Sequence, residues 1–267
     1  MKHKKILGIL LAIFCLPLCG GWTTPTNADN ESYYGGAQLI SFYSNYEQIS
    51  YSSKQIKTDI KTANGAPNYY PDATLPNGCG AAAGATILGF YDKYMDTIKN
   101  WSSVLPNGMY KKQDAVYVAQ VMKALFDEMN TNATQPGVTE NDFLTGLQNY
   151  TQSLGFSVNY DYIGNVSTLN YTSMKSAFSN NKAVVLFIKP DNLYSITNNS
   201  NTDTISTNYI SANHILVAYG YYEIQYTLSS GTRTDAYLYV SPCVNLATQQ
   251  YYKVTPSLVS AYIVDIK

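Results

Sequence analysis

Charge is scarce in this chain of 267 residues, and arginine is almost absent. Only 13% of the residues are charged, 17 basic and 18 acidic, against about 25% in a typical globular protein. Arg233 is the only arginine in the sequence. The low charge excludes a highly charged disordered polymer, and the lack of a basic excess argues against a nucleic-acid binder. The polar surface is therefore expected to consist mainly of hydroxyls, amides and phenols, which fits the 26 tyrosines.

Long apolar runs are also absent, except near the start of the sequence. Residues 6–18 are largely apolar and follow three lysines, which is the pattern of a secretory signal. We expect residues 1–28 to be a signal peptide that is cleaved after Ala28, and the remaining chain to be secreted and extracellular. Lipidation of Cys19 is the alternative, but Leu18 is larger than the small residue that such a cleavage prefers. No other run approaches ~18 apolar residues, so we expect no stable membrane insertion after signal removal.

Histidine and cysteine are rare once the signal is removed. The remaining chain has 14 basic and 18 acidic residues, one histidine (His214) and two cysteines (Cys79 and Cys243). Two cysteines are too few for a disulfide framework, although a single Cys79–Cys243 disulfide stays an alternative in a secreted protein. Without a paired spacing such as C-x2-C, the sequence predicts no zinc site, and it implies no cofactor.

The order of the expected elements predicts an α+β protein. Residues 29–69 are polar and weakly periodic, and they suggest an N-terminal arm or pro-segment before a main domain at residues 70–267. In that domain, the patterns predict helices at residues 79–95, 114–129, 139–154 and 172–179. They predict strands at residues 156–162, 183–188, 214–224, 236–240 and 262–266. The polar residues 192–211 predict a loop. A helical first half is thus expected to pack on a mostly antiparallel sheet from the second half.

Two residues carry the chemistry that the sequence predicts. Cys79 opens a helix of small residues, where unpaired backbone N–H groups and the helix dipole favour a thiolate. His214 begins a strongly apolar strand directly after a polar segment, at the rim of a sheet, where a general base for a thiol can lie. Each residue alone is more often a packed core residue. The pair in this order, a cysteine at a helix start and a histidine much later, favours nucleophilic catalysis.

The segments around these two residues resemble a known family. LPNGCGAAAGATILGFYD (residues 75–92) is similar to the nucleophile helix of secreted papain-clan cysteine peptidases, and NHILVAYGY (residues 213–221) is similar to their histidine strand. The closest likeness is to the bacteriocin-processing, double-glycine type superfamily, and it covers about residues 70–267. The resemblance implies a papain-like fold, with Cys79 as the nucleophile and His214 as the general base.

Two positions depart from the family pattern. Where the family commonly has an oxyanion-binding glutamine, six residues before the cysteine, this sequence has Ala73. Asn77 or the backbone N–H of Cys79 would have to replace that donor. Where the family has an aspartate that orients the histidine, this sequence has Ser241. Asn245, four residues later, is the favoured substitute, because an amide can hold an imidazole ring.

The sequence therefore supports two functions of different classes. The first is a secreted cysteine hydrolase that attacks a peptide or amide bond of a peptide or protein substrate, with Cys79, His214 and Asn245 as its catalytic residues. The second is a catalytically inactive domain of the same fold that binds a peptide or cell-wall partner, which the changes at Ala73 and Ser241 favour. An oxidised Cys79–Cys243 pair would silence the enzyme, and its reduction would activate it.

Overall fold

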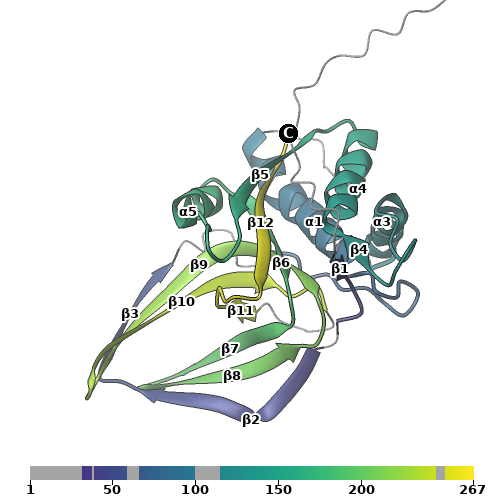
Figure 1. Cartoon of the computed structure of the whole chain (residues 1–267). Coiled ribbons are helices and arrows are strands. Elements are labelled where there is room, and N and C mark those ends of the chain that lie inside the picture. Colours follow the sequence, from purple (N-terminus) through teal and green to yellow (C-terminus); the bar gives the residue numbers. More distant parts are fainter. Residues whose placement is uncertain (1–31, 38, 59–65, 100–114, 245–249) are drawn as a thin grey trace, which may run out of the picture. The chain divides into compact units, whose positions relative to one another are not determined.

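A ten-stranded antiparallel sheet organises the protein (Figure 1). The computed structural model describes residues 32–37, 39–58, 66–99, 115–244 and 250–267. The expected signal peptide, residues 1–28, and Asn245 lie outside these residues.

The described helices are α1 (Cys79–Lys99), α3 (Ala115–Glu128), α4 (Glu140–Ser153) and α5 (Tyr171–Ser179). The strands are β1 (Tyr33–Tyr34), β2 (Leu39–Ser50), β3 (Ser53–Thr58), β4 (Val138–Thr139), β5 (Val158–Gly164), β6 (Ala183–Ile188), β7 (Asp191–Asn199), β8 (Thr202–Ile210), β9 (His214–Leu228), β10 (Gly231–Ser241), β11 (Gln250–Tyr252) and β12 (Leu258–Ile266). The main sheet has the order β2-β8-β7-β11-β10-β9-β6-β12-β5, and β3 pairs with β9 outside this path. β1 and β4 form a separate two-stranded sheet.

The expectation of a papain-like α+β fold with a helical first half is wrong. The structure is mostly antiparallel sheet, and β2 and β3 precede α1 in the chain and join the same sheet as the later strands. The expected loop at residues 192–211 is instead largely the hairpin of β7 and β8, which pair from end to end. These strands lie away from α1, α3 and α4 (Figure 1). Their buried aliphatic residues are few, Leu193, Ile205 and Ile210, so their sequences lack the apolar alternation that reveals a strand.

The middle of the sheet is buried on both faces. Val185 of β6 and Val217 of β9 belong to the cluster that includes the apolar residues of α1. Leu186 and Leu216, one position along each strand, belong to a second cluster with Phe178 of α5. Because successive side chains of a strand point to opposite faces, helices on both sides leave no polar face. This explains the continuous apolar runs in β6 and β9.

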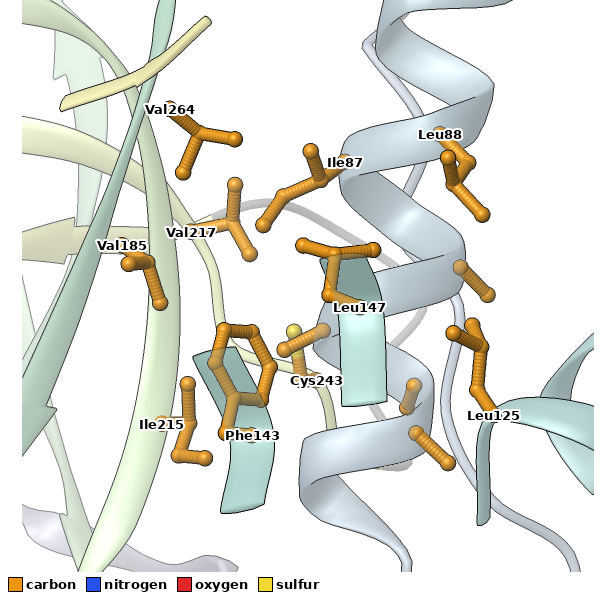
Figure 2. Packing of buried hydrophobic residues seen from close by; sticks show 14 of the residues in the cluster. Ile87, Leu88, Leu125, Phe143, Leu147, Val185, Ile215, Val217, Cys243 and Val264 are labelled. Atoms are coloured by element: carbon orange, nitrogen blue, oxygen red, sulfur yellow. The ribbon is translucent and has the colours of Figure 1, made fainter. Parts of the chain in front are cut away.

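Small residues on α1 let the helix approach its neighbours closely. A Cβ atom added at Gly80 would lie 2.6 Å from Cγ1 of Val138, and one at Gly84 would lie 3.0 Å from Cε of Met129. Figure 2 shows the apolar side chains around the helix: Ile87, Leu88, Leu125, Phe143, Leu147, Val185, Ile215, Val217 and Val264. Packing on these sides fixes the first turn of α1, and with it Cys79, against β4 and β9.

A buried carboxylate ties the strands β3, β8 and β9 and the turn between β2 and β3 together. The side chain of Asp203 is fully buried, and its two oxygens lie 2.7 and 3.0 Å from Nζ of Lys54. The hydroxyls of Tyr51 and Tyr226 donate to the same carboxylate at 3.2 and 2.9 Å. Desolvation acts to lower the pKa of Lys54, but its interactions with Asp203 and Tyr51 outweigh this and raise the pKa. This polar cluster adjoins a small apolar cluster that includes Ile49, Ile205 and Ile224.

Candidate functional site

Cys79 lies at the first position of α1, after a tight turn. The N–H of Gly78 donates to the carbonyl of Leu75 at 3.0 Å, and the carbonyl of Gly78 accepts the N–H of Ala82 at 3.0 Å. Asn77 has a φ of 61°, in the left-handed region that asparagine tolerates better than most residues. This turn directs the chain into the helix and leaves the first N–H groups of α1 without intrahelical partners.

The Cys79 thiol is buried, and burial controls its ionisation. Only 4% of the residue is exposed. Burial and, to a smaller extent, charge on the Cys243 thiol raise the pKa of the Cys79 thiol to about 12. The backbone N–H groups of Ile215, Gly80 and Cys79 itself face the sulfur and act in the opposite direction. The sequence predicted a lowered pKa from the helix start, but in this closed arrangement desolvation outweighs the three N–H groups.

His214 is held at the start of β9 by the end of the neighbouring strand. It pairs with Ile188 of β6 and is fully buried. Its Nε2 atom lies 2.5 Å from the carbonyl oxygen of Pro242, the residue after β10. A carbonyl only accepts hydrogen bonds, so this contact places the proton on Nε2 and leaves Nδ1 as an unprotonated base. Nδ1 is buried and has no hydrogen-bond partner among the described residues.

Burial also keeps the His214 imidazole neutral. Desolvation lowers its pKa to about 4, and the hydrogen bond to the Pro242 carbonyl compensates only in part. At pH 7 both groups of the candidate pair are therefore neutral, an imidazole and a thiol. The main chain next to His214 comes close to Cys79, because the N–H that faces the Cys79 sulfur belongs to Ile215, the residue after His214. Nδ1 of His214 makes no hydrogen bond to the Cys79 sulfur in this structure.

The second cysteine lies near the first, and both are free thiols. Cys243 is fully buried and has a φ of 50°. Burial raises its pKa to about 12, while hydrogen bonds from Ser241, Thr86 and the backbone of Val217 lower it. The structure thus shows no Cys79–Cys243 disulfide between these two described residues.

The residues expected to assist Cys79 and His214 either bond to other groups, lack a suitable side chain or lie outside the described residues. Ser241 donates its hydroxyl to Oδ1 of Asn68 at 2.5 Å. Asn245, the favoured histidine-orienting residue, is not among the described residues. Asn77 donates its amide to Oδ1 of Asn132 at 3.0 Å. Ala73 is exposed in the preceding turn and has no donor on its side chain. Among the suggested oxyanion donors, the backbone N–H of Cys79 is the one that faces the sulfur.

The Pro242 carbonyl is the site group that sequence reasoning missed. β9 and β10 pair antiparallel, so the end of β10 lies beside the start of β9. The sequence pattern singles out two side chains, Ser241 and Asn245, which stand on either side of Pro242 in the chain. A main-chain carbonyl carries no signal in residue type, since every residue has one. Only coordinates could therefore select Pro242.

The described residues contain no cluster of three histidine, cysteine or acidic side chains suited to a metal ion. None of the helices in this part of the chain combines the length and the apolar character needed to cross a membrane.

Comparisons with protein-family models, curated proteins and solved structures find no match to this chain. The resemblance of residues 75–92 and 213–221 to cysteine peptidases thus stays a prediction from sequence. The function has to be argued from the geometry around Cys79 and His214.

Proposed function

We propose that the protein is a secreted cysteine hydrolase that attacks a peptide or amide bond, with Cys79 as the nucleophile and His214 as the general base. The observation that carries this proposal is the state of the imidazole. Its Nε2 proton is held by the Pro242 carbonyl, and its Nδ1 is a buried base without a hydrogen-bond partner in the described structure. A buried unpartnered nitrogen costs free energy, and a role as a proton acceptor for Cys79 accounts for it.

The reaction follows from these two groups. Nδ1 of His214 takes the thiol proton as the Cys79 sulfur bonds to the carbonyl carbon. The N–H groups of Cys79 and Gly80 face the developing negative charge at the start of α1. The carbon–nitrogen bond then breaks, and the amine leaves with the proton from the imidazolium. Water hydrolyses the resulting thioester, with His214 again accepting a proton, and the thiol is restored.

A second function is favoured by the burial of both groups. A thiol with a pKa of about 12 and an imidazole with a pKa of about 4 do not form an ion pair at rest. This state suits a non-catalytic module that binds a peptide or cell-wall partner. The two functions differ in whether the Cys79 thiol becomes reactive when the structure opens.

Alkylation by iodoacetamide at pH 7, mapped to each cysteine by mass spectrometry, separates the two functions. Cys243 is a matched internal control, since it is also buried with a pKa of about 12, and its described hydrogen bonds involve Thr86, Ser241 and Val217. We expect Cys79 to react about tenfold faster than Cys243, because a neighbouring imidazole favours the thiolate during local opening.

The variant His214→Ala is expected to remove this difference between the two cysteines. Equal and slow labelling of Cys79 and Cys243 in the unmodified chain would contradict the hydrolase and support the binding module. Mass spectrometry of the secreted chain in the same experiment measures whether residues 1–28 are removed.

A further inference from the structure

The first described residues form a short strap on the body of the protein. β1 pairs antiparallel with β4, with Tyr33 opposite Thr139 and Tyr34 opposite Val138. This two-stranded sheet is separate from the main sheet. Figure 1 shows β1 and β4 beside the end of α1 that carries Cys79, and Val138 packs directly against Gly80. The strap therefore lies next to the candidate site.

Tyr34 anchors the strap. Only 1% of the residue is exposed, and its ring makes an edge-to-face contact with Phe187, with the centroids 5.0 Å apart. Phe187 lies opposite Ile215 in the pairing of β6 with β9, and the N–H of Ile215 faces the Cys79 sulfur. A side chain in the position of Tyr34 is therefore separated from Cys79 by a single layer of residues, Phe187 and Ile215.

The backbone of the strap contacts the neighbours of both candidate catalytic residues. The N–H of Gly35 donates to the carbonyl of Asn213 at 3.2 Å, and the Asn213 amide donates to the carbonyl of Tyr33 at 3.2 Å. A Cβ atom at Gly35 would lie 2.9 Å from Cβ of Asn77, and one at Gly36 would lie 2.8 Å from its Oδ1. Asn213 precedes His214, and Asn77 stands two residues before Cys79. The strap thus spans the approach to the pair.

We propose that residues 33–36 are an internal ligand, a removable cover that occupies a peptide-binding groove leading to Cys79. The groove consists of the edge of β4, the main chain and amide of Asn213, and the surface of Asn77. These groups bind the strap as sheet edges bind peptides, through main-chain hydrogen bonds and a pocket for one side chain. The site would take an extended peptide with an aromatic side chain in the place of Tyr34. This inference rests on the proposed function, and it adds that the strap regulates access of the substrate to Cys79.

The strap is also suited to lift away. β1 has two residues and pairs only with β4 among the described strands. Cleavage after Ala28 would leave a free end a few residues before Tyr33, so release would require no loop to open. Segments near a free end are among the first to open in native proteins. The burial of Tyr34 in the main apolar cluster opposes opening, so release of the strap has to empty the Tyr34 pocket.

The substitution Gly35→Ala in the full secreted chain tests the proposal. The added methyl group would lie 2.6 Å from Cα of Gly137, a backbone atom that cannot move aside cheaply. We expect iodoacetamide to label Cys79 at least about tenfold faster than in the unmodified protein, with Cys243 unchanged. The control is Gly231→Ala, where no atoms lie within 4 Å of the added carbon. Its φ of 127° adds a backbone strain that Gly35 does not have, so it also controls for a general loss of stability. It should label at the unmodified rate.

A peptide supplied in solution completes the test. The peptide ESYYGGAQ, the sequence of residues 31–38, is expected to slow the labelling of Cys79 in Gly35→Ala, and ESYYAAAQ is not. If Gly35→Ala does not fold, Asn213→Ala removes one hydrogen bond to the strap and should give a smaller increase in the same direction. Unchanged labelling of Cys79 in the folded variants, or equal protection by both peptides, would overturn the proposal.

The effect of Gly35→Ala is measured again in a chain that also carries His214→Ala. This comparison distinguishes the failure of this proposal from the failure of the proposed function. A steric cover predicts that Gly35→Ala increases the labelling of Cys79 by the same factor with or without the histidine. If that factor is preserved but the histidine has no effect on labelling, the cover stands and the hydrolase fails. If the histidine matters and the glycine does not, the hydrolase stands and the cover fails.

Discussion

The free energy of unfolding is expected to fall by about 3 kcal/mol between pH 7 and pH 4 because of His214 alone. Burial lowers the pKa of this imidazole from 6.5 to about 4 in the folded chain. The unfolded chain therefore binds a proton from about pH 6.5 downward, whereas the folded chain resists protonation. The stabilisation is fully present above pH 6.5 and is lost as the pH falls toward 4. A difference of this size in pKa corresponds to about 3 kcal/mol at 1.36 kcal/mol per unit.

Urea unfolding of the unmodified chain and of His214→Gln between pH 4 and pH 7 measures this contribution. Carboxylates such as Glu47, Glu223 and Asp265 have lowered pKa values and also lose stabilisation in acid. They are the same in both proteins, so their effect cancels in the difference between the two curves. We expect this difference to change by about 3 kcal/mol over the pH range. Parallel curves would mean that the imidazole is not desolvated, and the assignment of Nδ1 as a buried base would be wrong.

Removing the Lys54 ammonium is expected to destabilise the fold by about 3 kcal/mol. Its Nζ atom lies 2.7 Å from the Asp203 carboxylate, which is fully buried. In Lys54→Met the carboxylate would stay buried with only the hydroxyls of Tyr51 and Tyr226 as donors. An uncompensated buried charge costs about 3–5 kcal/mol, and the two hydroxyls favour the lower value. Urea denaturation measures the change.

A surface pair provides the matched control for this prediction. Lys123 and Asp127 form an ion pair whose side chains are 60% and 59% exposed, so Lys123→Met should cost less than about 1 kcal/mol. The double variant Lys54→Met with Asp203→Leu should recover much of the lost stability, because no buried charge remains. Equal small effects of Lys54→Met and Lys123→Met would show that Asp203 is not buried in solution.

The sequence revealed the parts of the fold that bury apolar faces. The run at residues 183–188 was predicted with the bounds that β6 has, and β9 begins at His214 as expected. The helix predicted from residue 139 is capped by Thr139, whose hydroxyl accepts the N–H of Asp142 at 3.1 Å. Each of these signals comes from local packing or capping, which residue type records directly.

Prediction from the sequence was wrong or incomplete for the polar strands and for the main-chain carbonyl that binds His214. β2, β7 and β8 carry many hydroxyl and amide side chains, and their pairing is long-range, with residues 39–50 opposite residues 202–210. No local pattern encodes such pairing. At the site, Cys79 and His214 were chosen by residue type, but the group that holds the imidazole is a carbonyl. The strap over the site was missed because its contacts depend on glycine backbone and on Asn213.

A long-range nitrogen–proton NMR spectrum of the secreted chain tests the central claim most directly. His214 is the only histidine after residue 28, so its two ring nitrogens are assigned without ambiguity. At pH 7 we predict a protonated Nε2 and an unprotonated Nδ1, and a shift of the Nδ1 signal on Cys79→Ser with little change at Nε2. A proton on Nδ1, or an Nδ1 signal that does not respond to Cys79→Ser, would contradict the assignment of His214 as the base for Cys79.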